Sequence, residues 1–162
     1  MITKRLPLLA AALLVASLSA TAQEPSIVGA WALVGAEKQL PDGTRVSDYG
    51  PNPHGHAIFT ADGHYSVQIY RAERLTFSSG DKFKGTPEEY KDASLGMSVH
   101  FGRYTLDPVK HILTFRIDRS SVPNLDDTIA VRPYELKGDE LSWRVAPRPD
   151  GSVPVTTLRR AR

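Results

Sequence analysis

The sequence contains no cysteine. No disulfide can therefore staple the fold, and stability has to come from the burial of apolar side chains. The chain is long enough for this, because a domain of ~140 residues buries roughly 70% of its unfolded surface around one core. A long polar linker, an internal repeat and a low-complexity run are also missing, so we expect a single domain.

Long hydrophobic runs are missing too, except at the start. Residues 1–22 combine a basic beginning, an apolar run over residues 6–18 and the small-residue ending Ala-Thr-Ala, which is the layout of a secretory signal peptide. The run is too short to span a bilayer; an uncleaved N-terminal anchor is the alternative interpretation. We predict a signal peptide at 1–22, a folded domain at 23–162 without a membrane span, and a soluble periplasmic or secreted protein.

An excess of one charge is absent from this predicted mature chain. The full sequence has 20 Lys and Arg against 18 Asp and Glu, and the signal peptide removes only Lys4 and Arg5, so the balance becomes 18 to 18. Nucleic acids and anionic membranes attract clustered basic surfaces. The one basic cluster, Arg159, Arg160 and Arg162, is interpreted as a solvated tail, and we expect neither kind of partner.

The motifs of several enzyme classes are missing as well. There is no G-x-S-x-G for a serine hydrolase and no glycine-rich phosphate or dinucleotide loop. Glu88 and Glu89 are explained by a helix start, and Asp126 and Asp127 by a turn. We therefore assign no catalytic residue and no cofactor, and the question whether the protein is an enzyme stays open.

What the sequence does contain is a β-hairpin within residues 49–70. Residues 61–63 are placed in a three-residue loop with Gly63 in the left-handed conformation, so that Thr60 faces His64. A two-residue Asp-Gly loop would mix apolar with polar residues on both faces. In the favoured register one face carries Ala57, Phe59, Tyr65, Val67 and Ile69, and the other carries His56, Ile58, Ser66, Gln68 and Tyr70.

The remaining pattern predicts an all-β chain with one short helix. Strands are expected near residue 45 and at residues 27–37, 98–106, 112–118, 129–136, 140–145 and 153–159. Residues 86–89 read Thr-Pro-Glu-Glu and predict a helix start with a capping box. Tyr90, Ala93 and Met97 are expected to pack this helix against an end or flank of the barrel. About eight to nine strands at this spacing predict a closed antiparallel β-barrel that holds one small ligand.

Ordered motifs along the chain add a family resemblance. They are G-x-W at residues 29–31, Y-G-x-x-P-x-G at 49–55, D-G-H at 62–64, G-T-P-E-E-Y at 85–90, F-G-x-Y at 101–104 and P-N at 123–124. With them the chain resembles the bacterial and fungal lipocalin-like domain family over nearly the whole mature sequence. Leu125 and Leu158 depart from the aromatic residues that the family tends to have there.

The resemblance implies a lipocalin-like antiparallel β-barrel of about eight to nine strands. It implies a cavity more firmly than a reaction. It also implies that an arginine of the last strand, Arg160 or Arg159, covers Trp31 through an aromatic–guanidinium stack that closes the barrel.

Candidate ligand-binding residues are polar side chains within the predicted strands. His56, Gln68 and Tyr70 share one face of the hairpin, which is either the solvated outside of the barrel or the polar lining of a pocket. The first alternative is favoured because antiparallel sheets usually turn polar residues to water. His100, Tyr104 and Arg132 are further pocket candidates, with a surface or rim position as the alternative.

The histidines do not predict a metal site. In the favoured register His56 and His64 are too far apart to share an ion, and no third ligand accompanies His54 and His56. We therefore assign no metal ligand.

Three functions follow as hypotheses. The leading one is an exported protein that binds a small apolar or amphipathic molecule in the barrel, with a few polar groups fixing its orientation. The second is an isomerase or cyclase acting on an apolar intermediate, with His100, Tyr104, Gln68 or Arg132 assisting proton transfer or polarisation. The third is an interaction module that uses the barrel surface. All three leave the ligand's identity and the oligomeric state open.

Overall fold

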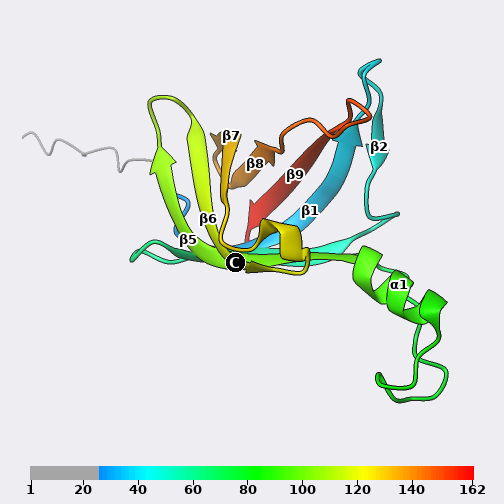
Figure 1. The fold of residues 1–162 in the computed structure, drawn as a ribbon. Helices are drawn as coiled ribbons and strands as arrows, with labels where there is room; N and C mark the ends of the chain where they lie inside the picture. Colours follow the sequence, from blue (N-terminus) through cyan, green and yellow to red (C-terminus); the bar gives the residue numbers. More distant parts are fainter. Residues whose placement is uncertain (1–25) are drawn as a thin grey trace, which may run out of the picture.

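Nine antiparallel strands form one sheet in residues 26–162, the part of the chain that this computed structural model describes (Figure 1). The predicted signal peptide lies outside the described residues. The strand order is β2-β1-β3-β4-β5-β6-β7-β8-β9, and β1 also pairs with β9. This pairing closes eight strands into a barrel and leaves β2 as an extra strand, which confirms the predicted all-β architecture. The strands are β1 Gly29–Gln39, β2 Arg45–Ser47, β3 His54–Phe59, β4 His64–Tyr70, β5 Met97–Asp107, β6 Ile112–Ser120, β7 Ile129–Lys137, β8 Glu140–Arg144 and β9 Val153–Arg160, with a short 3₁₀ helix at Pro123–Leu125.

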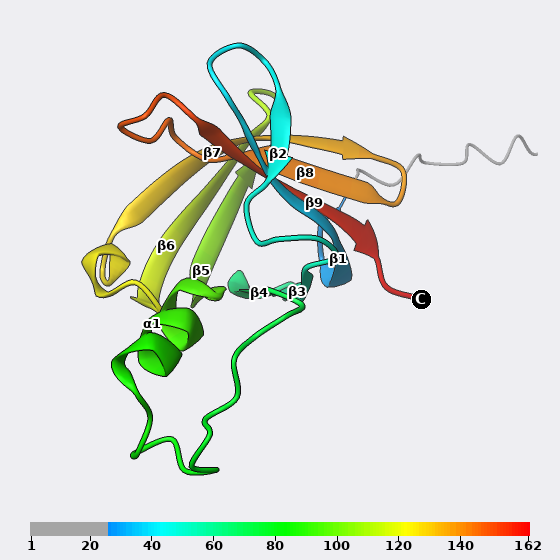
Figure 2. The same cartoon turned by 90° about the vertical axis from the view of Figure 1, so that its right-hand side faces the viewer.

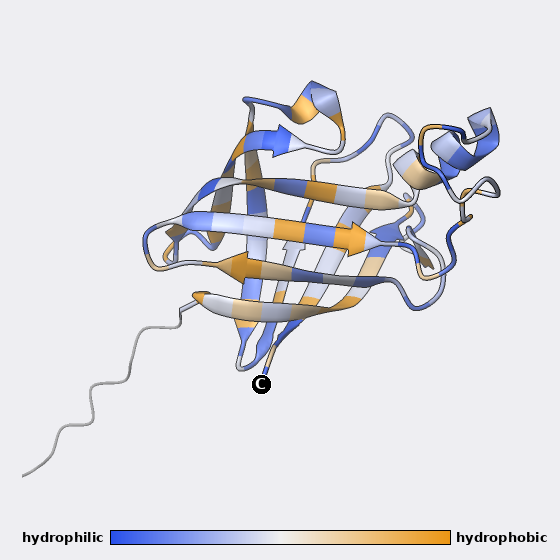
Figure 3. Ribbon diagram, turned by 90° about the horizontal axis from the view of Figure 1, so that it is seen from below, coloured by the Kyte–Doolittle hydropathy of each residue, from blue (hydrophilic) through white to orange (hydrophobic). Residues whose placement is uncertain are grey.

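The hairpin of β3 and β4 has the predicted register. The Thr60 amide donates a hydrogen bond to the His64 carbonyl at 2.9 Å, and Gly63 has a φ of +85°. Ala57 pairs with Val67, and both are buried, whereas Ile58 is 41% exposed. The apolar face of the hairpin therefore turns inward, and the same alternation colours many of the strands in Figure 3.

The helix α1, Pro87–Leu95, begins where the sequence predicts. The Thr86 hydroxyl accepts a hydrogen bond from the Glu89 amide, and the Glu89 carboxylate accepts one from the Thr86 amide, which completes the capping box. The predicted packing is wrong. Met97 already belongs to β5, and Tyr90 is 42% exposed, with its ring centroid 5.6 Å from that of Phe77. This contact lies within the segment between β4 and β5, and that segment projects from the barrel (Figure 2).

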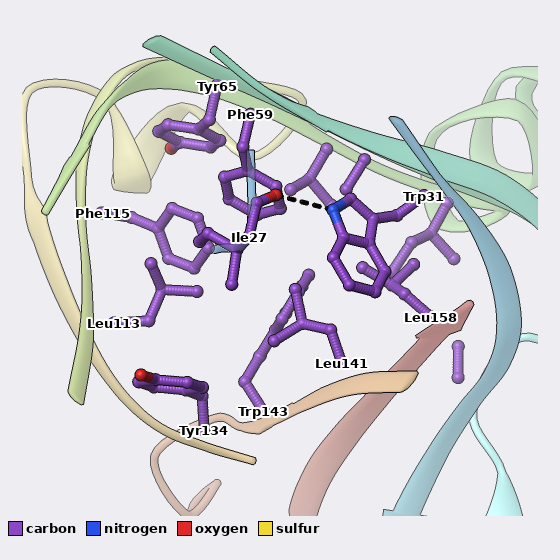
Figure 4. Close-up of a cluster of buried hydrophobic side chains, with 14 of the residues drawn as sticks. Ile27, Trp31, Phe59, Tyr65, Leu113, Phe115, Tyr134, Leu141, Trp143 and Leu158 are labelled. Atoms are coloured by element: carbon purple, nitrogen blue, oxygen red, sulfur yellow. Dashed lines mark hydrogen bonds between the residues drawn. The ribbon is translucent and has the colours of Figure 1, made fainter. Parts of the chain in front are cut away.

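Aromatic and branched side chains fill most of the barrel interior (Figure 4). The ring of Phe115 lies 4.5 Å from that of Tyr65, 6.3 Å from that of Phe59 and 5.7 Å from that of Trp143, measured between centroids. Stacked, tilted and edge-on contacts of this kind stabilise aromatic pairs beyond simple burial. The other fully buried apolar side chains are Ile27, Trp31, Ala57, Val67, Leu113, Ile117, Leu141 and Leu158.

Trp31 and Arg160 join the first strand to the last. The two residues pair directly, and the Arg160 guanidinium carbon lies 4.2 Å from the centroid of the Trp31 ring. Arg160 also donates hydrogen bonds to the carbonyls of Val28 and Ser26 at 2.9 and 2.6 Å. The expected arginine over the tryptophan is therefore confirmed, and it is Arg160 that fills this position.

Candidate ligand-binding site

A hydrogen-bonded pair, Tyr65 and His100, lies on the inner wall of the barrel. His100 of β5 pairs directly with Val67 of β4, and Val67 is buried in the core. Paired residues point to the same face, so the imidazole turns inward beside Tyr65. The Tyr65 hydroxyl and His100 Nδ1 are 2.9 Å apart, and the tautomer of the imidazole sets which of the two donates.

Arg132 of β7 adds a positively charged side chain to the same inner wall. It pairs directly with Leu113 of β6, whose side chain is fully buried. The next residue toward the N-terminus, Val131, is 54% exposed and points outward. Alternation along the strand thus turns the Arg132 side chain inward, where it is half-buried.

Phe115 connects Arg132 to the Tyr65–His100 pair. It pairs with Ala130 and is therefore the diagonal neighbour of Arg132 across β6 and β7. Its ring centroid lies 4.5 Å from that of Tyr65 and 5.5 Å from that of His100. Tyr65 and His100 thus contact one aromatic ring, and Arg132 occupies the strand position diagonal to it. We refer to Tyr65, His100 and Arg132 as the polar cluster.

Burial and mutual charge set the protonation states of the polar cluster. Burial, followed by the positive charge of Arg132, lowers the pKa of His100 to about 4. Burial raises the pKa of Tyr65, and the negative charge of Asp118 acts in the same direction. Burial also lowers the pKa of Arg132, although a guanidinium stays protonated in proteins. At neutral pH the imidazole and the phenol are therefore neutral, and Arg132 carries the charge.

Arg132 forms no ion pair within residues 26–162, where Arg119, Arg148 and Arg160 each pair with an aspartate. In this part of the chain its guanidinium donates one hydrogen bond, to the carbonyl of the adjacent Val131 at 3.4 Å. A half-buried cation without a counter-ion is unfavourable. The described part of the fold therefore keeps a positive charge inside the barrel without a carboxylate of residues 26–162 to neutralise it.

The inner wall around this charge is partly accessible. The bulge on β6 at Asp118 lets Ser120 pair with His100, and Ser98 pairs with the buried Ile69. Ser98, Ser120 and Ala130 are half-buried, as are His100 and Arg132. We refer to these five inward-facing residues as the accessible wall. It borders the aromatic core, so a molecule bound there would meet both apolar and polar groups.

Two hollows, of about 650 and 320 Å³, lie elsewhere on the protein. The larger follows outward-facing positions of β7, β8 and β9, where Glu135, Ser142 and Thr157 form one paired row. The smaller lies over Thr105 and Thr114 of β5 and β6. The polar cluster lines neither hollow. The inner wall is therefore a candidate site because of its polar and charged side chains.

Between residues 26 and 162, no group of three or more His, Cys, Asp or Glu side chains is placed to hold a metal ion. No helix in that range has both the length and the apolar character needed to cross a membrane.

Comparison with known proteins places the barrel in a family. The family model of the lipocalin-like domain matches residues 28–161. The chain belongs to the lipocalin-like domain family. A lipocalin-like protein from Bacteroides uniformis is 14% identical, covers 83% of this chain and 97% of its own, and has a TM-score of 0.42. A mutant of the fluorescent protein UnaG is 16% identical, with 83% and 96% coverage and a TM-score of 0.37. Curated protein sequences gave no match.

The lipocalin-like barrel turns three of the six predicted ligand-binding residues outward. His56 and Gln68 pair directly with each other and alternate with the buried Ala57 and Val67. Tyr70 follows on the same face, with the Arg74 guanidinium carbon 5.3 Å from its ring centroid. The sheet thus separates this trio from the polar cluster, in line with the favoured reading of a solvated outer face.

The other three predicted residues turn inward, but they have different surroundings. His100 and Arg132 belong to the polar cluster. The Tyr104 hydroxyl instead donates a hydrogen bond to the Thr60 carbonyl at 2.9 Å, and its ring meets that of Phe59 edge-on at 5.1 Å. Tyr104 therefore supports the hairpin loop of the lipocalin-like barrel. The ligand-binding role of all six residues stays a prediction.

Sequence reasoning missed three groups on the inner wall. The sequence places Tyr65 on the apolar face of the hairpin and not among the site residues. Its hydroxyl is the signal that this apolar face also carries a polar group. Ser98 lies two residues before His100, so strand alternation places both on one face. Ser120 gave no such signal, because the bulge at Asp118 breaks the alternation of β6.

Proposed function

We propose that this protein is an exported carrier that binds a small, mainly apolar molecule at the accessible wall of its lipocalin-like barrel. The observation that carries the proposal is the polar cluster inside a mainly apolar and aromatic interior. Small-molecule sites combine such a lining with a few placed polar groups that fix the ligand's orientation. Export rests on the signal-peptide pattern of residues 1–22.

An isomerase or cyclase acting inside the barrel is the alternative function, and the Tyr65–His100 hydrogen bond is the observation that favours it. Such a pair can relay a proton. However, a general base works best when its pKa lies near the working pH, and His100 has a pKa of about 4. The neutral imidazole is thus better suited to orienting a ligand than to removing a proton, and binding is the better supported function.

A blocking substitution tests the binding site directly. Ala130 belongs to the accessible wall, whereas its neighbour Val131 is 54% exposed on the outside. We expect wild-type protein to enhance the fluorescence of the neutral probe N-phenyl-1-naphthylamine, A130F to lose at least tenfold in affinity, and the control V131F to bind like wild type. Equal binding by all three proteins would place the probe outside the barrel.

Native mass spectrometry tests the physiological part of the proposal. The mature protein would be purified gently from its own periplasm or medium. We expect a discrete added mass, from a bound small molecule, that disappears on denaturation. A mature N-terminus near Gln23 would show that the signal peptide is removed. A chain that retains residues 1–22 and stays in the cytoplasmic fraction would contradict export.

A further inference from the structure

The charge of Arg132 points to the chemistry of the ligand. Within residues 26–162 this inward-facing guanidinium has no carboxylate partner. The sheet could have turned the charge to water, since the flanking Val131 points outward and is 54% exposed. Instead β7 exposes the valine and half-buries the arginine, which is the reverse of the usual order for an antiparallel sheet.

The surroundings of Arg132 are suited to an anion. His100 is neutral at neutral pH and Tyr65 stays protonated, so neither repels a negative charge. Both can share a hydrogen-bond network with an acidic group held by the guanidinium, whose planar fork matches a carboxylate in two-point contact. The acidic group that affects the polar cluster is Asp118, whose negative charge helps to raise the pKa of Tyr65. It is exposed and does not form an ion pair with Arg132.

The apolar side of the same wall is suited to a hydrocarbon body. Phe115 contacts both Tyr65 and His100, and Ala130 lies directly opposite Phe115. A molecule with its acidic end at Arg132 would therefore lay its apolar part along these two residues. We infer that the ligand is an amphipathic organic anion, a carboxylate on an apolar body, and that Arg132 is its anchoring residue. This inference rests on the binding function proposed above.

A matched pair of probes tests the anchor. Binding of dodecanoate and of dodecanol is measured by displacement of N-phenyl-1-naphthylamine at pH 7.5. We expect wild type to prefer the carboxylate by at least tenfold, because only the carboxylate can form a two-point, charge-assisted hydrogen bond with the guanidinium. R132Q should bind both probes equally, R132K should retain a reduced preference, and R116Q should match wild type because Arg116 is exposed on the outer face.

Unfolding provides the second measurement. If Arg132 serves a ligand, R132Q without ligand should unfold at the same temperature as wild type or higher, since a poorly compensated charge is removed. A large loss of stability would show a structural role and overturn the inference. Equal affinity of wild type for both probes, or a preference retained by R132Q, would also overturn it while leaving the carrier function intact. Failure of wild type to bind N-phenyl-1-naphthylamine and both probes would overturn the carrier function and the anchor together.

Discussion

A Cβ atom added to Gly102 would lie 2.1 Å from the carbonyl oxygen of Arg116 on the neighbouring strand. Gly102 also has a φ of +155° and lies at the register shift between β5 and β6. We expect G102A to lose about 3 kcal/mol or more in unfolding free energy, because backbone has to move. In G35A, where a Cβ meets nothing within 4 Å, the change should stay below about 1 kcal/mol. Urea unfolding of both variants checks this, and equal losses would contradict it.

His100 should make stability depend on pH. Its pKa is about 4 in the folded protein and near 6.5 when unfolded, so the unfolded chain binds the proton more readily. The contribution of the neutral His100 to the free energy of unfolding is complete above pH 6.5. It is lost as the pH falls toward 4, and the total loss is on the order of 3 kcal/mol.

The control for this effect is H100Q, which keeps a polar group beside Tyr65 but cannot titrate. Urea midpoints would be measured for both proteins between pH 4 and pH 7.5. The difference between the two stability curves should change steeply across this window, with wild type losing more on acidification. Parallel curves would show that His100 has an ordinary pKa in the fold.

Arg160 should stabilise the barrel more than its neighbour Arg159. R160A removes the stack on Trp31 and two hydrogen bonds to backbone carbonyls, for an expected loss of about 2 kcal/mol. Arg159 is exposed, and its ion pair with Glu140 spans 3.9 Å, so R159A should cost less than about 1 kcal/mol. Thermal unfolding of the pair checks the ranking, and a larger loss for R159A would refute the role of the stack.

The capping box of α1 should act locally. T86A removes the hydroxyl that accepts a hydrogen bond from the Glu89 amide. The loss should cost about 1 kcal/mol of helix stability. Hydrogen exchange of the α1 amides should accelerate several-fold, while the strand amides keep their rates because the segment projects from the barrel. E88A, which leaves the box intact, serves as the control. Acceleration throughout the barrel would show that the helix supports the whole fold.

Sequence patterns predicted the strands well because their physical causes are local. The register of β3 and β4 follows from one three-residue loop and the alternation of five apolar residues, and both are visible in the sequence. Gly63 with its positive φ fixed the loop. The helix start at Thr86 was local as well, but its packing was not, because the sequence does not show that Tyr90 meets Phe77 within its own segment.

The polar cluster was harder to predict because it is assembled across strands. Tyr65 and His100 are 35 residues apart, and their strands are joined by a long helix-containing segment, so no single tight turn sets the register between them. Arg132 breaks the rule that polar residues of a half-buried strand face water. The side of the sheet on which such a residue lies becomes clear only when its pairing partner is known. For Arg132 this partner is Leu113, which is buried.

The closure of β1 against β9 has a consequence for how this chain avoids self-association. Open strand edges template pairing with other chains, and in the closed sheet order the outermost strand is β2, only Arg45–Ser47. β9 covers backbone of both β1 and β8. Without β9, backbone edges of β1 and β8 would both be open. The hazard of aggregation is thus greatest in any partly unfolded state in which residues 153–160 are detached from the sheet.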